Sequence, residues 1–180
     1  MPNFAGRPFI MEVRKPKNGK KEADLGAIQK EISESGHGIE VRGLKYVSNA
    51  DVALVSDSHF DKEYEAEVEI AGGASRDEIK KILALDGAML EQRTPLRVMH
   101  RRSDLVRKRK VLELTAVSEN PLVFRIRAEA GTYIKELING DGGRTKPSFS
   151  EAIGREAKCI KLAVIEIEDA FLAEIVEGKQ

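Results

Sequence analysis

The strict alternation over residues 62–70 constrains the fold of this chain more than any other feature. In the segment Lys-Glu-Tyr-Glu-Ala-Glu-Val-Glu-Ile, Tyr64 and the apolar residues at every second position after it face one way, while four glutamates face the other. A repeat of two residues is typical of a strand with one face on a core and the other in water. We therefore expect a sheet with one covered face.

The rest of the chain predicts further strands and helices. Ser75 followed by Glu78 has the pattern of a capping box, and Thr132 is the expected N-cap of a later helix. The predicted fold is α+β, a mostly antiparallel mixed sheet with flanking helices, in a single domain over residues 1–180. We expect further strands over residues 7–14, 39–47, 106–118, 122–130 and 158–169, and helices over residues 24–35, 75–83, 132–139, 148–155 and after 171.

The charge is balanced overall but unevenly distributed. Residues 1–21 contain six basic residues against one acid, and residues 93–110 contain eight against one. Because the net charge is zero, the remainder carries −12. A single basic run is often only a solvated face, but two such runs in an otherwise acidic chain favour a polyanionic partner such as RNA.

Several functional classes are excluded by spacing. Residues 140–148, Gly-Asp-Gly-Gly-Arg-Thr-Lys-Pro-Ser, lack the spacing of a nucleotide-binding P-loop. Cys159 is the only cysteine, and His37, His59 and His100 lie too far apart in sequence for a metal motif, so we expect no metal site. No apolar run approaches the roughly 18 residues of a membrane helix, and no signal core precedes residue 6. A cytoplasmic location and no membrane contact are expected.

Four segments occur in the order seen in pseudouridine synthases. These are Gly-Arg-Pro-Phe at residues 6–9, Lys-Glu-Tyr at 62–64, Gln-Arg-Thr-Pro at 92–95 and Ala-Gly-Thr-Tyr-Ile-Lys-Glu-Leu at 130–137. The last resembles the GTYIR-type motif of the TruB class. Together with His-Arg-Arg at residues 100–102, they make the chain similar to the archaeal and eukaryotic tRNA pseudouridine synthases that carry an N-terminal THUMP-type domain.

That resemblance implies a chemistry and a set of site residues. The family modifies T-loop uridines 54 and 55 of tRNA, and it flips the target uridine out of its stack. An aspartate acts as nucleophile or base, a cation keeps it ionised, and no metal or organic cofactor takes part. By the resemblance, Tyr64 and Lys135 are catalytic, and Tyr133, Ile134 and Leu162 bind the substrate. Without it, Tyr64, Ile134 and Leu162 would be interpreted as core residues.

The basic residues around these motifs are the expected contacts with tRNA. Their cationic side chains would pair with backbone phosphates, which give affinity without sequence preference. The expected RNA-binding residues are Arg93, His100, Arg101, Arg102, Arg107, Arg109, Arg144 and Lys146.

The family's catalytic aspartate lies just upstream of the Gly-Arg-Pro-Phe segment. Here Met1–Ala5 precede Gly6, and Glu12 is the only acid before residue 22. We therefore expect the C-terminal part of a catalytic domain, inactive without an N-terminal part that carries the aspartate, supplied by a separate subunit together with a THUMP-type domain or lost by truncation. The alternatives are a stand-alone, non-catalytic tRNA- or RNA-binding protein and a structural subunit that holds another modification enzyme.

Overall fold

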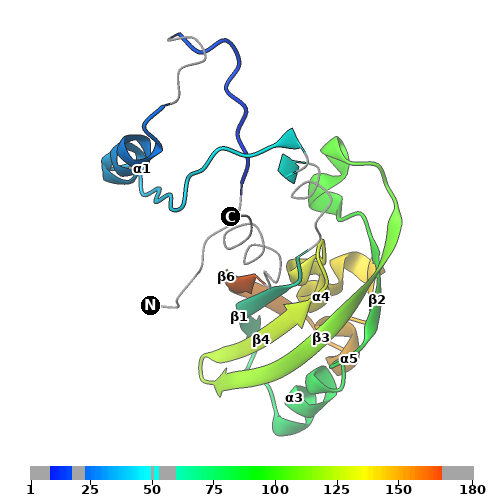
Figure 1. Cartoon of the computed structure of the whole chain (residues 1–180). Helices are drawn as coiled ribbons and strands as arrows, with labels where there is room; N and C mark the ends of the chain where they lie inside the picture. The colour runs from blue at the N-terminus through cyan, green and yellow to red at the C-terminus, as the bar shows by residue number, and fades with distance from the viewer. Residues whose placement is uncertain (1–8, 18–22, 50, 53–59, 168–180) are drawn as a thin grey trace. The chain divides into compact units, whose positions relative to one another are not determined.

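The chain divides into two compact units in a computed structural model that describes residues 9–17, 23–49, 51–52 and 60–167 (Figure 1). One unit comprises residues 8–58, and the other comprises residues 59–180 together with 1–7. The division was not expected from the sequence, but two compact units can belong to one domain, so the single domain over residues 1–180 stays a prediction.

The described part of residues 8–58 includes the helix α1 (Leu25–Glu34). This helix confirms the predicted helix over 24–35. The Asp24 carboxylate caps it by accepting a hydrogen bond from the Ala27 amide at 2.9 Å. The predicted strands over residues 7–14 and 39–47 are wrong wherever the structure describes them, since residues 9–14 and 39–47 form no strand. A strand requires a hydrogen-bonded neighbour, and none of the described residues supplies one there. The Val41 amide instead donates to the Ser33 hydroxyl at 3.3 Å.

Six strands of the other unit form one sheet in the order β5-β2-β3-β4-β1-β6, with every pair antiparallel. The prediction of a mostly antiparallel sheet is therefore confirmed, and the predicted strand over 62–70 has the observed bounds. Two strands, β2 and β5, were not predicted, and residues 7–8, 168–169 and the tail after 171 lie outside the described residues. The bounds are β1 (Lys62–Ile70), β2 (Met89–Arg93), β3 (Val106–Glu119), β4 (Leu122–Ala128), β5 (Thr145–Lys146) and β6 (Ala157–Ile167).

Three short helices cover one face of this sheet, α3 (Arg76–Leu83), α4 (Ile134–Asn139) and α5 (Phe149–Ile153) (Figure 1). The Ser75–Glu78 capping box is present as predicted. Thr132 is not the N-cap of α4, which is Tyr133, because the Thr132 hydroxyl donates to the Glu129 carbonyl at 2.6 Å instead. No helix among residues 9–17, 23–49, 51–52 and 60–167 is long and apolar enough to cross a membrane.

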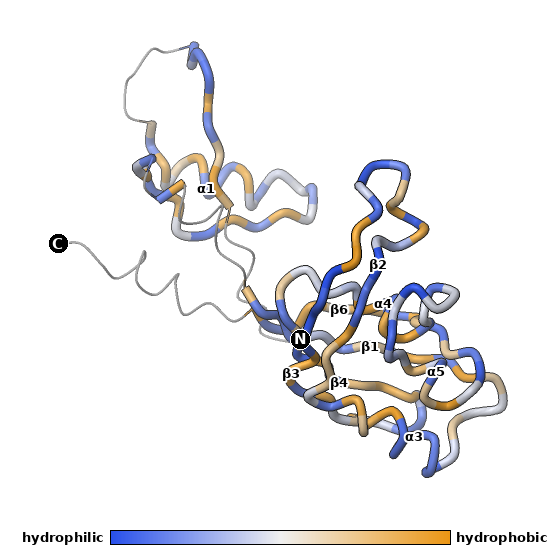
Figure 2. The backbone as a smooth tube through the Cα atoms, turned by 90° about the vertical axis from the view of Figure 1, so that its right-hand side faces the viewer, coloured by the Kyte–Doolittle hydropathy of each residue, from blue (hydrophilic) through white to orange (hydrophobic). Residues whose placement is uncertain are grey.

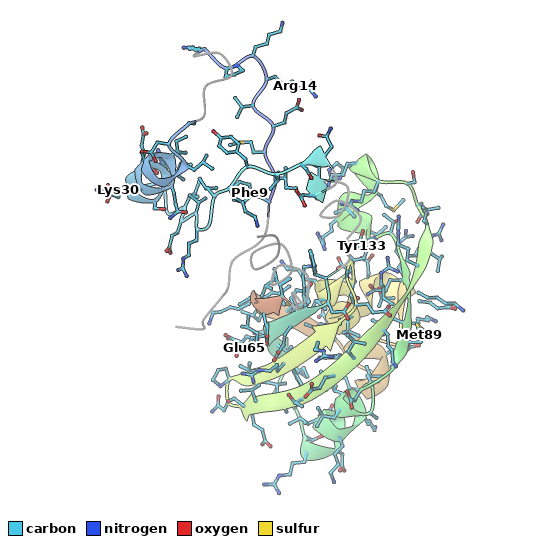
Figure 3. The ribbon with its side chains drawn as sticks, in the orientation of Figure 1. Phe9, Arg14, Lys30, Glu65, Met89 and Tyr133 are labelled. Atoms are coloured by element: carbon cyan, nitrogen blue, oxygen red, sulfur yellow. The ribbon has the colours of Figure 1, made fainter. Side chains whose placement is uncertain are left out.

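The core lies between the sheet and these helices. Alternate residues of β1, β4 and β6 meet the apolar side chains of α4 and α5, and the apolar stretches along the strands are visible in Figure 2. Phe124 on β4 and Phe149 on α5 pack edge to face with ring centroids 5.1 Å apart. The opposite face carries the predicted glutamates, and Glu65 in Figure 3 is one of them. Cross-strand ion pairs form there, among them Lys161 with Glu67 at 2.6 Å.

Two 3-10 turns complete the unit, η1 (Leu96–Arg101) between β2 and β3 and η2 (Gly140–Gly143) after α4. Gly140 ends α4 with a left-handed φ of 78°, and a Cβ at this position would lie 2.8 Å from the Ser148 hydroxyl oxygen. The close approach and the positive φ both require glycine. This turn returns the chain to β2, where the Arg93 amide donates to the Arg144 carbonyl at 2.8 Å.

Candidate functional site

Tyr64 and Leu162 lie on the helix-covered face of neighbouring strands. Ala66 on β1 is paired with Leu162 on β6, and Tyr64 is paired with Val164, so Tyr64 and Leu162 are diagonal neighbours on one face. Both are half-buried against the core. Burial raises the pKa of the Tyr64 phenol above its ordinary value.

The first turn of α4 carries the next two residues. Ile134 is buried in the same core cluster that Tyr64 and Leu162 pack against, whereas Lys135 is exposed. Burial raises the pKa of the Cys159 thiol on β6, and the Lys135 charge acts in the opposite direction, so Lys135 lies within electrostatic reach of β6. No carboxylate of the described residues forms an ion pair with Lys135. The structure thus makes Tyr64 and Leu162 neighbours, places Ile134 in the core that they pack against, and leaves Lys135 without an ion pair to a described carboxylate.

A buried amide fixes the turn that precedes α4. Gln92 on β2 is only 1% exposed, and its Nε2 donates to the Tyr133 carbonyl at 3.0 Å, while the Tyr133 amide donates to Gln92 Oε1 at 2.9 Å. The Gln92 side-chain amide thus forms with the Tyr133 backbone the same pair of hydrogen bonds that a residue of a neighbouring strand would form. Gln92 therefore sets the position of Tyr133 and of the residues that follow it.

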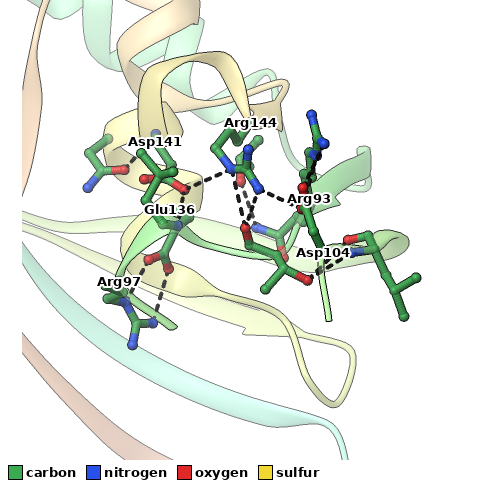
Figure 4. A network of polar contacts seen from close by, with 12 residues as sticks. Arg93, Arg97, Asp104, Glu136, Asp141 and Arg144 are labelled. Carbon is green, nitrogen blue, oxygen red and sulfur yellow. Dashed lines mark hydrogen bonds and ion pairs between the residues drawn. The ribbon is translucent and has the colours of Figure 1, made fainter. Parts of the chain in front are cut away.

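An ion pair holds η1 against the same turn. Arg97 Nε and Nη2 donate to the two carboxylate oxygens of Glu136 at 2.7 and 3.2 Å, and the hydrogen bond to Glu136 raises the pKa of Arg97 (Figure 4). The Glu136 side chain is 4% exposed and that of Arg97 is 52% exposed. The Arg97 guanidinium also lies 5.9 Å from the centre of the Tyr133 ring, a cation–π geometry. The loop between β2 and β3 is thereby fastened to α4.

Two of the arginines expected to bind RNA are engaged inside the protein. Arg93 contacts Asp104 at 2.6 Å, and Arg144 contacts the same carboxylate at 2.7 Å and the Thr94 carbonyl at 2.7 Å (Figure 4). Hydrogen bonding from Arg93, helped by Arg144, lowers the pKa of Asp104. Asp141 adds to the network by accepting from the Leu96 amide at 3.0 Å. Arg93 and Arg144 thus shape the loop, whatever else they contact.

The other predicted cations fall into two groups. His100, Arg101 and Arg102 are exposed at the end of η1 and form no ion pair with any described carboxylate. Lys146 is also exposed and lies 3.9 Å from Glu151, a weak contact at that distance. These four side chains remain available to an anionic ligand.

Arg107 and Arg109 point to the covered face of the sheet. They lie directly opposite Gln92 and Leu90 on β2, which are both buried, so the four side chains share a face. Arg107 Nη1 donates to the Thr94 hydroxyl at 3.2 Å. The even-numbered lysines of β3 point to the opposite face of the sheet, where Lys108 lies 3.7 Å from Glu91. Arginines and lysines of the basic run therefore lie on different faces of the strand.

Sequence reasoning missed the residues that hold this site together. Gln92 belongs to a quoted motif and Arg97 to the basic run, so both carried a signal that was not used. Which cation or amide each of the acids Asp104, Glu136 and Asp141 contacts could not be predicted, since these partners lie up to 45 residues away in sequence. No group of three potential metal ligands occurs within the described part of the chain.

Comparison with known proteins gives a family for the chain. The family model described as "Pus10, C-terminal" matches residues 4–168. The tRNA pseudouridine synthase Pus10 of Pyrococcus furiosus is 39% identical over 167 residues, which cover 91% of this chain and 42% of that protein. Its counterpart from Thermoplasma acidophilum is 44% identical over 167 residues, covering 90% of this chain and 42% of its own. The chain thus spans about two fifths of the length of these relatives.

One solved structure overlaps with the fold in part. The crystal structure of a Cbf5-Nop10-Gar1 complex aligns over 59% of this chain and 29% of its own, with 28% identity and a TM-score of 0.44. An overlap of this extent does not decide the fold, which is given by the strand order and helices described above.

Proposed function

Because this chain belongs to the family described as Pus10, C-terminal, we propose that it is the C-terminal part of the catalytic domain of a tRNA pseudouridine synthase. The observation that carries the proposal is the family match over residues 4–168, joined to the neighbouring positions of Tyr64 and Leu162 on β1 and β6. The substrate would be a uridine in the T-loop of tRNA.

The chain's residues suit the roles that the resemblance gives them. Tyr64, half-buried against the core, would support the flipped uracil ring, and Ile134 and Leu162 would line the apolar side of the uracil pocket. Tyr133, whose backbone is held by two hydrogen bonds with the Gln92 side chain, would close the uracil pocket beside Ile134 and Leu162. Lys135 lacks a carboxylate partner among the described residues and would pair with the catalytic aspartate, holding it ionised. That aspartate would come from the part of the relatives that this chain does not match.

The reaction is an isomerisation and needs no co-reactant. The bond between C1′ of the ribose and N1 of uracil breaks, a bond between C1′ and C5 forms, C5 loses a proton and N1 gains one. The aspartate would act as nucleophile or base, and Tyr64 would assist removal of the C5 proton, the role that the resemblance gives it.

Tritium release tests the proposal, since pseudouridine formation frees the hydrogen at C5. A tRNA transcript labelled with [5-³H]uridine is incubated with the chain alone, and with the chain plus the remaining N-terminal part of the Pyrococcus furiosus relative. We expect no release from the chain alone and release from the combination. In the combination, Tyr64→Phe and Lys135→Met should lower the rate by about 100-fold or more, while Lys80→Met on the exposed side of α3 should not change it.

The outcomes separate the alternatives. Release from the chain alone would refute the role of an outside aspartate. Rates unchanged by both substitutions would refute the assigned site. Tight tRNA binding without release in any combination would favour the non-catalytic RNA-binding alternative. The separate N-terminal subunit and the cytoplasmic location stay predictions.

A further inference from the structure

The carboxylate of Glu136 is almost completely buried. Its side chain is 4% exposed, on the helix α4 that packs against β6, and Arg97 is the one cation among the described residues that contacts it. A buried carboxylate is costly to desolvate, and an apolar pair of similar size is often as stable as a buried ion pair or more so. Stability alone therefore does not account for the ion pair, which calls for a role that an apolar contact would not serve.

The contact is directional, as an apolar contact is not. Arg97 Nε and Nη2 donate to separate oxygens of the Glu136 carboxylate, so the two planar groups lie edge to edge (Figure 4). The neighbours of Arg97 on η1 are held as well, since the Leu96 amide donates to Asp141 at 3.0 Å and Val98 is 3% exposed. Arg97 thus extends from an anchored turn and fixes the position of α4 relative to η1.

Lys135 lies between two anchored points of the backbone. On one side, the Gln92 side chain forms two hydrogen bonds with the Tyr133 backbone. On the other side, Arg97 holds the Glu136 carboxylate. Gln92 restrains only the N-terminal side of the segment that carries Lys135, so Arg97 supplies the polar restraint on the C-terminal side.

The reaction would depend closely on where Lys135 lies. Its side chain is exposed and within electrostatic reach of β6, the strand that carries Leu162. Under the proposed function, Lys135 keeps the catalytic aspartate ionised, and the energy between two charges falls as their separation grows. A misplacement of about 1 Å in a catalytic group can cost about 100-fold in rate.

We propose that Arg97 is a positioning residue of the isomerisation, which holds Lys135 in place for the aspartate through its ion pair with Glu136. The inference rests on the proposed function and deepens it, because Arg97 acts on the same site without contacting the uridine. It also connects that site to the end of η1, where the exposed cations of residues 100–102 are expected to meet the tRNA. The turn that meets the tRNA and the helix that carries the lysine then move as one body.

A charge-neutral double variant tests the inference. Arg97→Met with Glu136→Gln removes one positive and one negative charge, so the net charge that faces the RNA is unchanged and no buried charge is left unpaired. The variant chain is combined with the N-terminal part of the Pyrococcus furiosus relative. Tritium release from labelled tRNA is followed in a single turnover at saturating enzyme, and the Kd for the tRNA is measured by fluorescence anisotropy. We expect the rate to fall about 10- to 100-fold, and the Kd and its salt dependence to stay unchanged.

The matched control is another bidentate pair of the same unit. Arg155 Nε and Nη2 donate to the two oxygens of Glu78 at 2.6 and 2.9 Å, and the guanidinium also donates to the carbonyls of Ala71 and Gly73. Arg155→Met with Glu78→Gln is charge-neutral too and removes more hydrogen bonds. It should nevertheless leave the rate unchanged, because this pair holds α3 rather than α4. Circular dichroism establishes that both double variants are folded at the assay temperature.

The possible results distinguish this inference from the proposed function. An unchanged rate in the Arg97 and Glu136 double variant would overturn the inference and leave the proposed function standing. A weaker Kd with a shallower salt dependence, at an unchanged saturating rate, would identify Arg97 as a phosphate contact and refute the positioning role. An equal loss of rate in the control would show that the rate follows stability, which also refutes it. No release from the unaltered combination would remove the proposed function and this inference together.

Discussion

Arg97→Met should destabilise the protein far more than Glu136→Gln, although both changes break the same ion pair. The reason is the difference in burial, 4% exposure for the Glu136 side chain against 52% for Arg97. Without Arg97, the Glu136 carboxylate remains in the core with no opposite charge. Without the carboxylate, the half-exposed guanidinium can turn to water.

The magnitudes follow from that asymmetry. Removing one member of a buried pair costs about 3–5 kcal/mol, and the partial exposure of Arg97 puts Arg97→Met near the lower end, about 3 kcal/mol. Glu136→Gln keeps the shape and loses one charge-assisted hydrogen bond, at a cost of about 1 kcal/mol. The difference of about 2 kcal/mol corresponds to roughly 4–8 °C in Tm for a chain of this length. The double variant should cost less than the sum of the two.

Urea unfolding followed by circular dichroism measures these values. Arg14→Met is the control, since its contact with Glu12 joins side chains that are 83% and 70% exposed, and it should cost less than about 0.5 kcal/mol. Equal costs for Arg97→Met and Glu136→Gln, or costs that add in the double variant, would show that the pair is not coupled as described.

Two further predictions concern salt and pH. Replacing Arg101 and Arg102 by Gln should flatten the slope of log Kd against log salt for a tRNA transcript by about 0.7–0.9 per lost contact, whereas Arg93→Gln, which removes an already paired guanidinium, should not; an unchanged slope in the double variant would place RNA binding elsewhere. Hydrogen bonds from Arg155 and from the helix cap lower the pKa of Glu78 from 4.5 to about 2, so this carboxylate stabilises the fold above pH 4.5 and the contribution is lost as the pH falls to about 2. Glu78→Gln should flatten the dependence of stability on pH in that window, and a curve parallel to that of the unaltered protein would contradict it.

The sequence predictions were accurate where a local pattern of side chains decides the structure, and failed where pairing with a distant segment decides it. Residues 62–70 were predicted to the residue because apolar and charged side chains alternate there without exception. In β2 the alternation is hidden, since the inward positions are Leu90 and Gln92 and a glutamine does not look like a core residue. Residues 39–47 have strand-forming composition but find no strand to pair with among the described residues, which no local pattern reveals.

The candidate site shows the same limit. Tyr64, Lys135 and Leu162 could be named only through the resemblance, since composition alone makes two of them core residues. The pairing of Arg97 with Glu136 spans 39 residues, and whether a cation faces solvent or a carboxylate is decided by the folded chain. The basic run over 93–110 was therefore found correctly as a feature, while the division of its arginines between paired and available side chains was not.

The two hydrogen bonds between the Gln92 side chain and the Tyr133 backbone have a consequence for how the protein folds. Its amide is buried and is satisfied chiefly by a backbone 41 residues farther along the chain. A partly folded form in which β2 had joined the sheet before α4 docked would bury that amide without partners, at a cost of about 1–3 kcal/mol. Such an intermediate is thereby disfavoured, and the joining of β2 and the docking of α4 become a single cooperative step. One polar side chain in the core thus links two segments that are distant in sequence into one folding unit.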